Sequence, residues 1–327
     1  MKPLLEVKNL AIAFKTHGRD LHAVRGISFS LNEGESLGIV GESGCGKSTA
    51  AKALLKLYPA HTSTAAGELF YDQQNLMDLS ESQMQKIRGS KISMIFQDPL
   101  SFLNPTQKIG LQIIEGFFRH FNAASRKEGR TAACQLLQEL GFADPEEVME
   151  AYPHTLSGGM RQRVMIALAL ICQPKILLAD EPASSLDAAM RDQMLSFLKR
   201  LQIQKKMSIL LISHDMSIAA KFCDRILVMY AGKIVESGPA DAIFRHPQHP
   251  YTEKLIQSIP GMDYPKQQPL ITIEGSPPSL ELPLKHCGFC TRCLSAMNIC
   301  AEASPPLYQI SGQHWSACFK HDERCRI

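Results

Sequence analysis

The stretch from Gly41 to Ser48 places the strongest constraint on how this chain can fold. It matches the pattern G-x-x-x-x-G-K-[ST], and it follows an apolar run, 36–40, that is typical of a buried strand. Glycines at these spacings let backbone N–H groups close around phosphate oxygens, and the helix expected from Lys47 onward adds a favourable partial charge at its start. A chance glycine-rich turn would lack such flanking elements. The sequence therefore predicts a phosphate-binding loop between a strand and a helix.

The residues of this loop have expected roles in binding a nucleotide. We expect Lys47 to neutralise oxygens of the β- and γ-phosphates and Ser48 to supply a ligand for Mg²⁺. Cys45 is interpreted as a small loop residue rather than a reactive thiol. The other nucleotide contacts are expected from Gly41, Glu42, Ser43, Gly44, Cys45, Gly46 and Thr49.

A second apolar run, 176–181, ends in two carboxylates, Asp180 and Glu181. Asp180 suits a magnesium partner held through water, whereas Glu181 can reach an attacking water as general base or orienting group. The acidic pair could instead cap the next element. The phosphate loop in the same chain favours the catalytic interpretation.

Strand-like runs recur along the chain and alternate with helical patterns, which favours a mostly parallel sheet covered by helices. Between 107 and 152 the pattern turns helical and polar, so we expect an inserted helical subdomain at about 105–160. The runs 225–230 and 233–236, joined through Ala231 and Gly232, predict a hairpin. The other expected strands are 4–14, 23–31, 36–40, 67–71, 92–96, 176–179 and 209–212.

Composition narrows the setting of the chain. With 327 residues, 45% of them hydrophobic, it can bury one large domain plus an appendage. Its apolar runs are far shorter than the roughly 20 residues that span a bilayer, and its first residues lack a secretory pattern, so we expect a cytoplasmic chain. A net charge of +3, from 35 basic and 32 acidic residues, does not indicate nucleic acid as a partner.

After Ser258 the composition changes. Six of the ten cysteines lie between Cys287 and Cys325, which in a cytosolic chain indicates a metal site rather than disulfides. Spacing alone leaves zinc and an iron–sulfur cluster open, since both need a compact thiolate cage. His286 and His314 could join a zinc site, though solvated loop positions are expected for both, and Cys325 is expected to be a free thiol. The prolines that interrupt regular structure here are Pro260, Pro265, Pro269, Pro277, Pro278 and Pro283.

The segment 156–162, with Ser157, Gly158 and Gly159, resembles the signature loop of ABC ATPases. It precedes a long apolar helix expected to end near Cys172 and then the acidic strand, in the order which that family uses. Gln97 after an apolar run, Asp187 in a Ser185-Leu186-Asp187 turn and His214 after a further strand also occur in family order, so the resemblance covers about residues 4–245. It implies an α/β phosphate-loop NTPase fold of the ABC type, with a RecA-like core, an antiparallel β subdomain and an inserted helical subdomain. We accordingly divide the chain into a nucleotide-binding domain, 1–245, and an extension, 246–327, with the cysteine cluster.

The resemblance also implies roles for these residues. Gln97 would sense nucleotide, contact Mg²⁺ and couple to membrane subunits, while His214 would contact the γ-phosphate. Phe14 lies where the family places an aromatic ring that stacks on adenine; the alternative is a core residue of an edge strand. The loop 157–159 would complete the site of a facing subunit, with Asp187 communicating across the dimer, so that ATP joins two such domains and hydrolysis releases them.

Further segments resemble the oligopeptide and dipeptide importer branch of the family. They are 94–99, 103–105, 152–154 and 249–252. This implies ATP hydrolysis at the cytoplasmic face of a bacterial inner membrane, as a peripheral protein. The implied partners are two permease subunits, a second similar ATPase, and an extracytoplasmic peptide-binding protein reached through the permease. A homodimer stays open.

Nickel and antimicrobial-peptide uptake systems share much of this pattern. A soluble ABC ATPase acting on nucleic acid is a rival from another class, but the chain lacks a basic, aromatic-rich stripe, so no nucleic acid is expected. Four cysteines resemble those that hold an iron–sulfur cluster, of the [4Fe–4S] kind, in related D-type subunits, and Cys290 has no counterpart. The four are Cys287, Cys293, Cys300 and Cys318.

Overall fold

The computed structural model describes residues 2–16, 18–59, 61–98, 102–121, 125–184, 186–259, 272–281 and 283–325. The chain forms two compact units. The first comprises Met1–Asn32, Ser36–Asp78 and Leu211–Ile327, and the second Glu33–Glu35 and Leu79–Leu210. Within the described ranges, no helix combines the length and the apolar character that a membrane-spanning segment needs. Several residues of the expected motifs lie outside these ranges, namely Pro99, Ser185, Pro260, Pro265 and Pro269.

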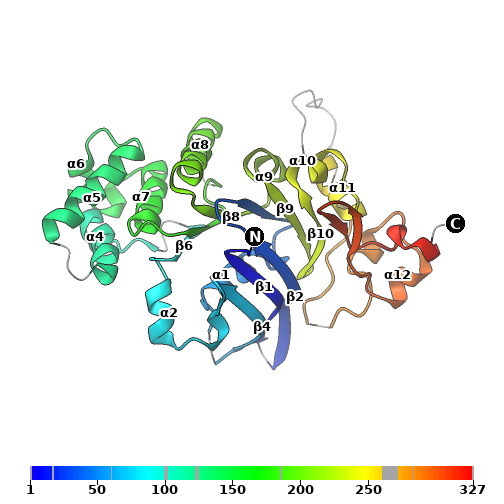
Figure 1. Cartoon of the computed structure of the whole chain (residues 1–327). Coiled ribbons are helices and arrows are strands. Elements are labelled where there is room, and N and C mark those ends of the chain that lie inside the picture. The colour runs from blue at the N-terminus through cyan, green and yellow to red at the C-terminus, as the bar shows by residue number, and fades with distance from the viewer. Residues whose placement is uncertain are drawn as a thin grey trace. The chain divides into compact units, whose positions relative to one another are not determined.

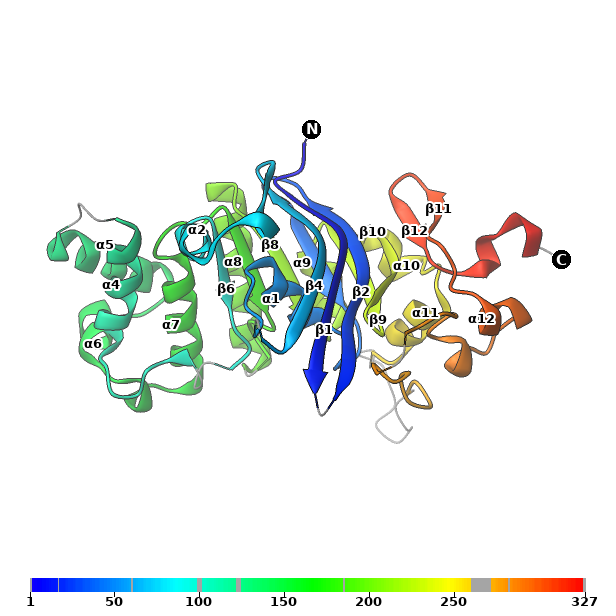
Figure 2. The same cartoon turned by 90° about the horizontal axis from the view of Figure 1, so that it is seen from below.

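The first unit contains an antiparallel sheet with the strand order β2-β1-β4-β5. Figure 2 shows β1, β2 and β4 side by side. β2 and β4 begin four residues earlier than expected, because both pair with the far end of β1, where Phe14 lies opposite Ser63. The strands are β1 (Leu5–Thr16), β2 (Arg19–Leu31), β4 (Ser63–Tyr71) and β5 (Gln74–Asn75).

A second sheet in this unit has the order β11-β12-β10-β9-β3-β8. β3 and β9 are parallel, whereas β10, β12 and β11 are antiparallel to their neighbours. The predicted hairpin is confirmed: Ala231 and Gly232 have φ values of 46° and 82°, the positive angles that a tight two-residue turn needs. The strands are β3 (Ser36–Val40), β8 (Ser208–Ser213), β9 (Arg225–Tyr230), β10 (Lys233–Pro239), β11 (Tyr308–Ser311) and β12 (His314–Ser316).

Residues after 258 therefore extend this sheet, because β12 pairs with β10 at Glu236–Ser316 and Ser237–Trp315. The helices of the first unit are α1 (Lys47–Leu54), α9 (Met216–Phe222), α10 (Ala240–Arg245), α11 (Pro250–Gln257) and α12 (Asn298–Glu302). Short 3-10 turns are η1 (Leu76–Asp78), η3 (Cys290–Arg292), η4 (Phe319–His321) and η5 (Glu323–Cys325).

The second unit contains parallel strands β6 and β7, with β8 next to β7; β8 crosses from this unit into the first. Helices α4 to α7 gather into one helical body, drawn in teal to green in Figure 1. The elements are α2 (Glu81–Ile87), β6 (Ile92–Ile95), α4 (Ile109–His120), α5 (Arg126–Glu139), α6 (Pro145–Glu150), η2 (Pro153–Thr155), α7 (Gly158–Leu170), β7 (Ile176–Asp180) and α8 (Ala188–Lys205).

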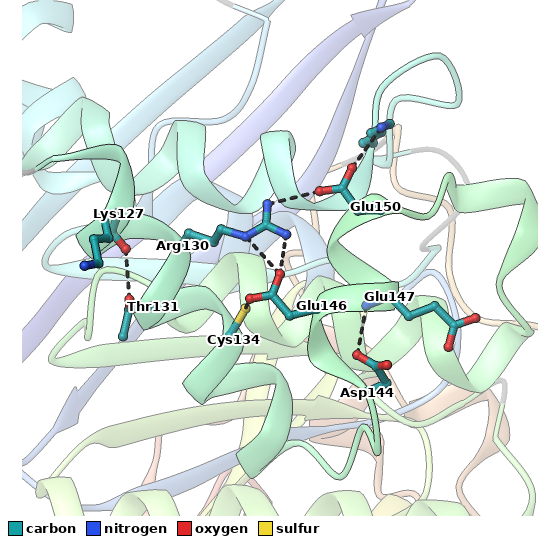
Figure 3. Close-up of polar contacts among 9 residues, drawn as sticks. Lys127, Arg130, Thr131, Cys134, Asp144, Glu146, Glu147 and Glu150 are labelled. Carbon is teal, nitrogen blue, oxygen red and sulfur yellow. Dashed lines mark hydrogen bonds and ion pairs between the residues drawn. The ribbon is translucent and has the colours of Figure 1, made fainter.

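Local signals explain these helices. Ser125 and Glu128 form a capping box that starts α5, and Asp144 accepts from the Glu147 N–H to start α6. Arg130 on α5 reaches Glu146 and Glu150 on α6, with its Nη1 3.0 Å from Glu150 Oε1 (Figure 3). These groups are solvent-exposed, so the ion pairs orient the two helices but contribute little stability.

Candidate active site

The phosphate loop follows β3, whose five residues are all buried. Gly41 has a φ of 154° and Gly46 of 103°, and a β-carbon on either would lie 2.1 Å from a backbone carbonyl oxygen, of Met229 and of Ala23 respectively. Only glycine combines these backbone angles with such close approach. The predicted strand–loop–helix arrangement is confirmed.

Lys47 is the first residue of α1, and its side chain stays inside the loop. Its Nζ donates to the carbonyl oxygens of Gly41, at 2.8 Å, and Glu42, at 2.9 Å. Ser48 and Thr49 follow, half-buried, in the first turn of the helix. Burial raises the pKa of the Cys45 thiol, so it is neutral near pH 7, in keeping with a packing residue.

Ser43, Gly44 and Phe14 belong to the same unit. Ser43 and Gly44 are exposed at the tip of the loop, and Gly44 has a φ of 79°. Phe14 is half-buried on β1. The alternative interpretation of Phe14, as a core residue of an edge strand, is wrong about the strand. β1 is an interior strand, because it pairs with β2 on one side and with β4 on the other.

His214 is exposed directly after β8. The next residue, Asp215, caps α9: its Oδ1 accepts from the Ser217 N–H at 2.8 Å. The cap fixes the turn that carries His214.

The acidic strand belongs to the second unit. β7 is buried along all five residues, and Asp180, its last residue, is 2% exposed. Glu181 follows with a φ of 49°, a left-handed conformation that a residue with a side chain adopts only under constraint. Gln97 Nε2 donates to Glu181 Oε2 at 3.2 Å, so the structure brings these two predicted residues together. The buried Gln162 amide donates to the Pro182 carbonyl and supports the turn.

The serine–glycine loop and Asp187 start two helices of the second unit. Ser157 is the N-cap of α7 and accepts from the Met160 N–H at 3.3 Å, and Ser157 and Gly158 are exposed. Asp187 is the exposed N-cap of α8 and accepts from the Met190 N–H at 2.9 Å. α7 ends at Leu170, two residues before the expected Cys172, because the Ile171 N–H makes the last helical hydrogen bond.

The cysteine cluster lies in the first unit. The Cys287 N–H donates to the Cys300 carbonyl at 3.0 Å, and the six cysteines from Cys287 to Cys325 are free thiols. The pKa of Cys287 is raised to about 11, mainly by burial and in smaller part by the nearby Cys300, Cys290 and Cys318. Burial likewise raises the pKa of Cys293 and Cys318.

These sulfurs are therefore close enough to interact electrostatically. Over the part of the chain that is described, however, no three His, Cys, Asp or Glu side chains form a group that could hold a metal ion. The donor set suits zinc or iron by its chemistry, but its present geometry is not a closed thiolate cage.

The expectation that His314 is a solvated loop residue is wrong. It lies on β12, is 4% exposed and has its Nε2 2.7 Å from Glu236 Oε1. The pairing of β12 with β10 buries it. His286 is half-buried, with Nδ1 3.6 Å from Cys290 Sγ.

Sequence reasoning missed one contact of the phosphate loop. The side chain of Arg292, between Cys290 and Cys293, pairs with Glu42 at 2.7 Å. These residues are 250 positions apart, and no local pattern marks the arginine.

The phosphate loop, the acidic strand end with its glutamine, and the serine–glycine helix start define the class of an ABC-type ATPase. The family model described as ABC transporter matches residues 24–184, and the one described as oligopeptide/dipeptide transporter, C-terminal region, matches 235–300.

Full-length relatives agree with these matches. The chain is 45% identical to the oligopeptide transport ATP-binding protein OppD of Bacillus subtilis (strain 168), over 95% of this chain and 87% of that protein. It is 43% identical to the dipeptide transport ATP-binding protein DppD of Lactococcus lactis subsp. cremoris, over 98% and 92%. Among solved structures, the ATP-binding cassette MJ0796, a dimer in a post-hydrolysis state bound to ADP and Pi, gives a TM-score of 0.66 at 29% identity, over 72% of this chain and 98% of that chain. The chain belongs to the ABC transporter ATP-binding family, in the branch that carries the oligopeptide/dipeptide transporter C-terminal region.

Proposed function

We propose that this chain hydrolyses MgATP to drive import of oligopeptides or dipeptides across a bacterial inner membrane, from its cytoplasmic face. The observation that carries the chemistry is the contact between Gln97 and Glu181 directly after β7, with Glu181 in a constrained backbone conformation. The peptide cargo rests on the relatives, two of which are named for oligopeptide and dipeptide transport.

The proposed hydrolysis divides the work among a few side chains. Lys47 neutralises the β- and γ-phosphates, and Glu181 accepts a proton from the attacking water while Gln97 orients that water or Glu181 itself. His214 stabilises charge on the γ-phosphate. Ser48, Gln97 and Asp180 would hold Mg²⁺, which would supply positive charge to neutralise the phosphate oxygens.

The proposed working form is a dimer with a second, similar ATPase, bound to two permease subunits that receive peptide from an extracytoplasmic binding protein. The exposed Ser157 and Gly158 at the start of α7 support this. An exposed helix N-terminus offers backbone N–H groups and a favourable partial charge, which suit the γ-phosphate of a nucleotide bound to a facing subunit. Phe14 is proposed to stack on the adenine.

The cysteine cluster is proposed to hold a [4Fe–4S] cluster through Cys287, Cys293, Cys300 and Cys318, with zinc as the alternative. The mutual electrostatic influence of these thiols supports a shared centre. Its proposed role is to hold the chain after 258 in one structure. Iron and sulfide analysis of anaerobically purified protein tests this: zinc without iron would replace the cluster by the alternative.

The enzyme assignment is tested by MgATP turnover of the full-length chain and its Glu181→Gln variant. We expect Glu181→Gln to have an at least hundredfold lower kcat and to keep its nucleotide binding, because glutamine has nearly the shape of glutamate but cannot act as a general base. Glu115→Gln, on the exposed face of α4, serves as the control. Equal turnover of parent and Glu181→Gln would contradict the role of Glu181, and stimulation by DNA or RNA rather than by permease would contradict transport.

A further inference from the structure

Glu42, the second residue of the phosphate loop, is held at three different groups. Its backbone N–H donates to the hydroxyl of Tyr251 at 2.8 Å. Its carbonyl oxygen accepts from Lys47 Nζ at 2.9 Å. Its carboxylate pairs with Arg292 through two parallel bonds, from Nη1 to Oε2 at 2.7 Å and from Nη2 to Oε1 at 2.9 Å. Two of these three partners, Tyr251 and Arg292, lie 209 and 250 positions away in the sequence.

Arg292 uses its whole donor set at this point. A guanidinium has five N–H donors, and two of them bind Glu42. The other three donate to the Tyr230 hydroxyl at 3.1 Å, the Ile273 carbonyl at 2.8 Å and the Glu274 carbonyl at 2.9 Å. The side chain is 3% exposed, and its hydrogen bonds with Glu42 raise its pKa above the ordinary value. No other side chain can make this set of bonds, because lysine offers three donors from one nitrogen.

Aromatic rings form the wall behind these contacts. The rings of Tyr230 and Tyr251 lie 4.6 Å apart, and Phe289 stands edge-on to both with centroids at 5.4 Å. All three residues are almost wholly buried. The hydroxyls that touch Arg292 and Glu42 thus come from rings that cannot easily shift.

The arginine comes from the cysteine-bearing loop 287–293. It is the last residue of η3, its N–H donates to the Phe289 carbonyl at 3.0 Å, and the Cys293 N–H closes the turn on the Cys290 carbonyl at 3.4 Å. The path of this loop therefore decides where the guanidinium lies.

Charge gives the contact a consequence for nucleotide binding. A carboxylate in a phosphate loop repels a polyphosphate unless a cation neutralises it. We propose that Arg292 is a positioning residue for the phosphate loop: through Glu42, the cysteine-bearing loop fixes the loop's shape and cancels a negative charge beside the bound phosphates. This rests on the proposed function only in assuming that the loop binds MgATP.

The test compares full-length variants in two assays, MgADP binding by calorimetry and MgATP hydrolysis. Arg292→Met is expected to weaken nucleotide affinity and raise KM about tenfold, with kcat within about twofold, because the catalytic groups are untouched while an unpaired carboxylate faces the phosphates. Arg292→Lys keeps the charge without the fork, so it should fall between parent and Arg292→Met. The matched control is Arg324→Met, which removes the ion pair of an exposed arginine with the buried Asp322 elsewhere in the same C-terminal region.

The double variant Glu42→Gln/Arg292→Met removes both charges and keeps the test decisive where Arg292→Met alone does not fold. We expect it to recover part of the affinity but to stay about threefold weaker than the parent, since the repulsion is gone and the positioning is not restored. Nucleotide affinity within 1.5-fold of the parent in the folded double variant, or equal affinities for it and Arg292→Met, would overturn the proposal. A parent that binds MgADP but does not hydrolyse MgATP would contradict the proposed function, while the binding comparison would still decide this inference.

Discussion

Replacing Glu236 by glutamine tests how the C-terminal part is joined to the sheet. Glu236, on β10, is fully buried and accepts three hydrogen bonds, from the Gln248 N–H at 2.6 Å, the His249 N–H at 2.9 Å and His314 Nε2 at 2.7 Å. A glutamine keeps one carbonyl oxygen and turns an NH₂ group toward a second donor. At least one buried backbone N–H then loses its acceptor, and the charge-assisted character of the remaining bonds is lost.

The magnitude follows from these losses. One unsatisfied buried donor costs about 1–3 kcal/mol, and weakening two charge-assisted bonds adds about 1 kcal/mol, so we expect about 3 kcal/mol of lost stability. At roughly 2 °C per kcal/mol for a chain of this size, the Tm should fall by about 6 °C. Circular dichroism on heating measures this, with Glu302→Gln on the exposed face of α12 as control.

Hydrogen exchange gives the local readout. The amides of Gln248 and His249 should exchange faster in Glu236→Gln, because they lose a carboxylate acceptor. A Tm within about 1 °C of the parent, together with unchanged exchange at both amides, would refute the reasoning that Glu236 holds the start of α11 and β12 to β10.

Two further predictions concern the loop and the response to acid. Gly46→Ala should abolish detectable nucleotide binding in a calorimetric titration, because its β-carbon would lie 2.1 Å from the Ala23 carbonyl oxygen; retained affinity would show that the loop has another path. Burial lowers the pKa of His249 to about 3, so the unfolded state binds a proton that the folded state does not, and stability should fall by about 1.4 kcal/mol per pH unit as the pH drops below about 6.5. His249→Asn can still accept from the Tyr251 N–H, but it should lose this pH-dependent part of the stability. Urea unfolding of the parent and the variant at pH 7 and pH 5 measures the difference. An equal change in stability between the two pH values in both proteins would contradict the assignment to His249.

The parts of the fold that sequence predicts are those set by neighbouring residues. The phosphate loop, the buried run before Asp180 and the hairpin at Ala231 and Gly232 each depend on local pattern and local backbone angles. The positive φ of Glu181 could not be predicted from the sequence, because glutamate is not a residue that indicates a left-handed backbone conformation.

The parts that sequence could not predict are pairings between distant segments. No local sequence pattern predicts that His314 contacts Glu236, which lies 78 positions earlier in the chain. The histidine is buried because its strand, β12, pairs with β10. The pairing of Arg292 with Glu42 likewise joins segments that are distant in the sequence. The place of Phe14 on an interior strand also depends on a later segment, because β4 covers that edge of β1. Periodicity reports how a segment is buried but not which segment buries it.

ATP hydrolysis by this chain is proposed to drive peptide import. The most direct measurement is uptake of a labelled peptide into vesicles that contain the chain with its copurified permease subunits, companion ATPase and binding protein, with MgATP supplied on the side of the chain. We expect labelled peptide to move from the side of the membrane that holds the binding protein to the side that holds this chain, and only when MgATP is present. This uptake should stop when the chain carries Glu181→Gln. ATP-dependent peptide uptake that continues undiminished in the Glu181→Gln complex, or no peptide uptake by an assembled complex that hydrolyses ATP, would contradict it.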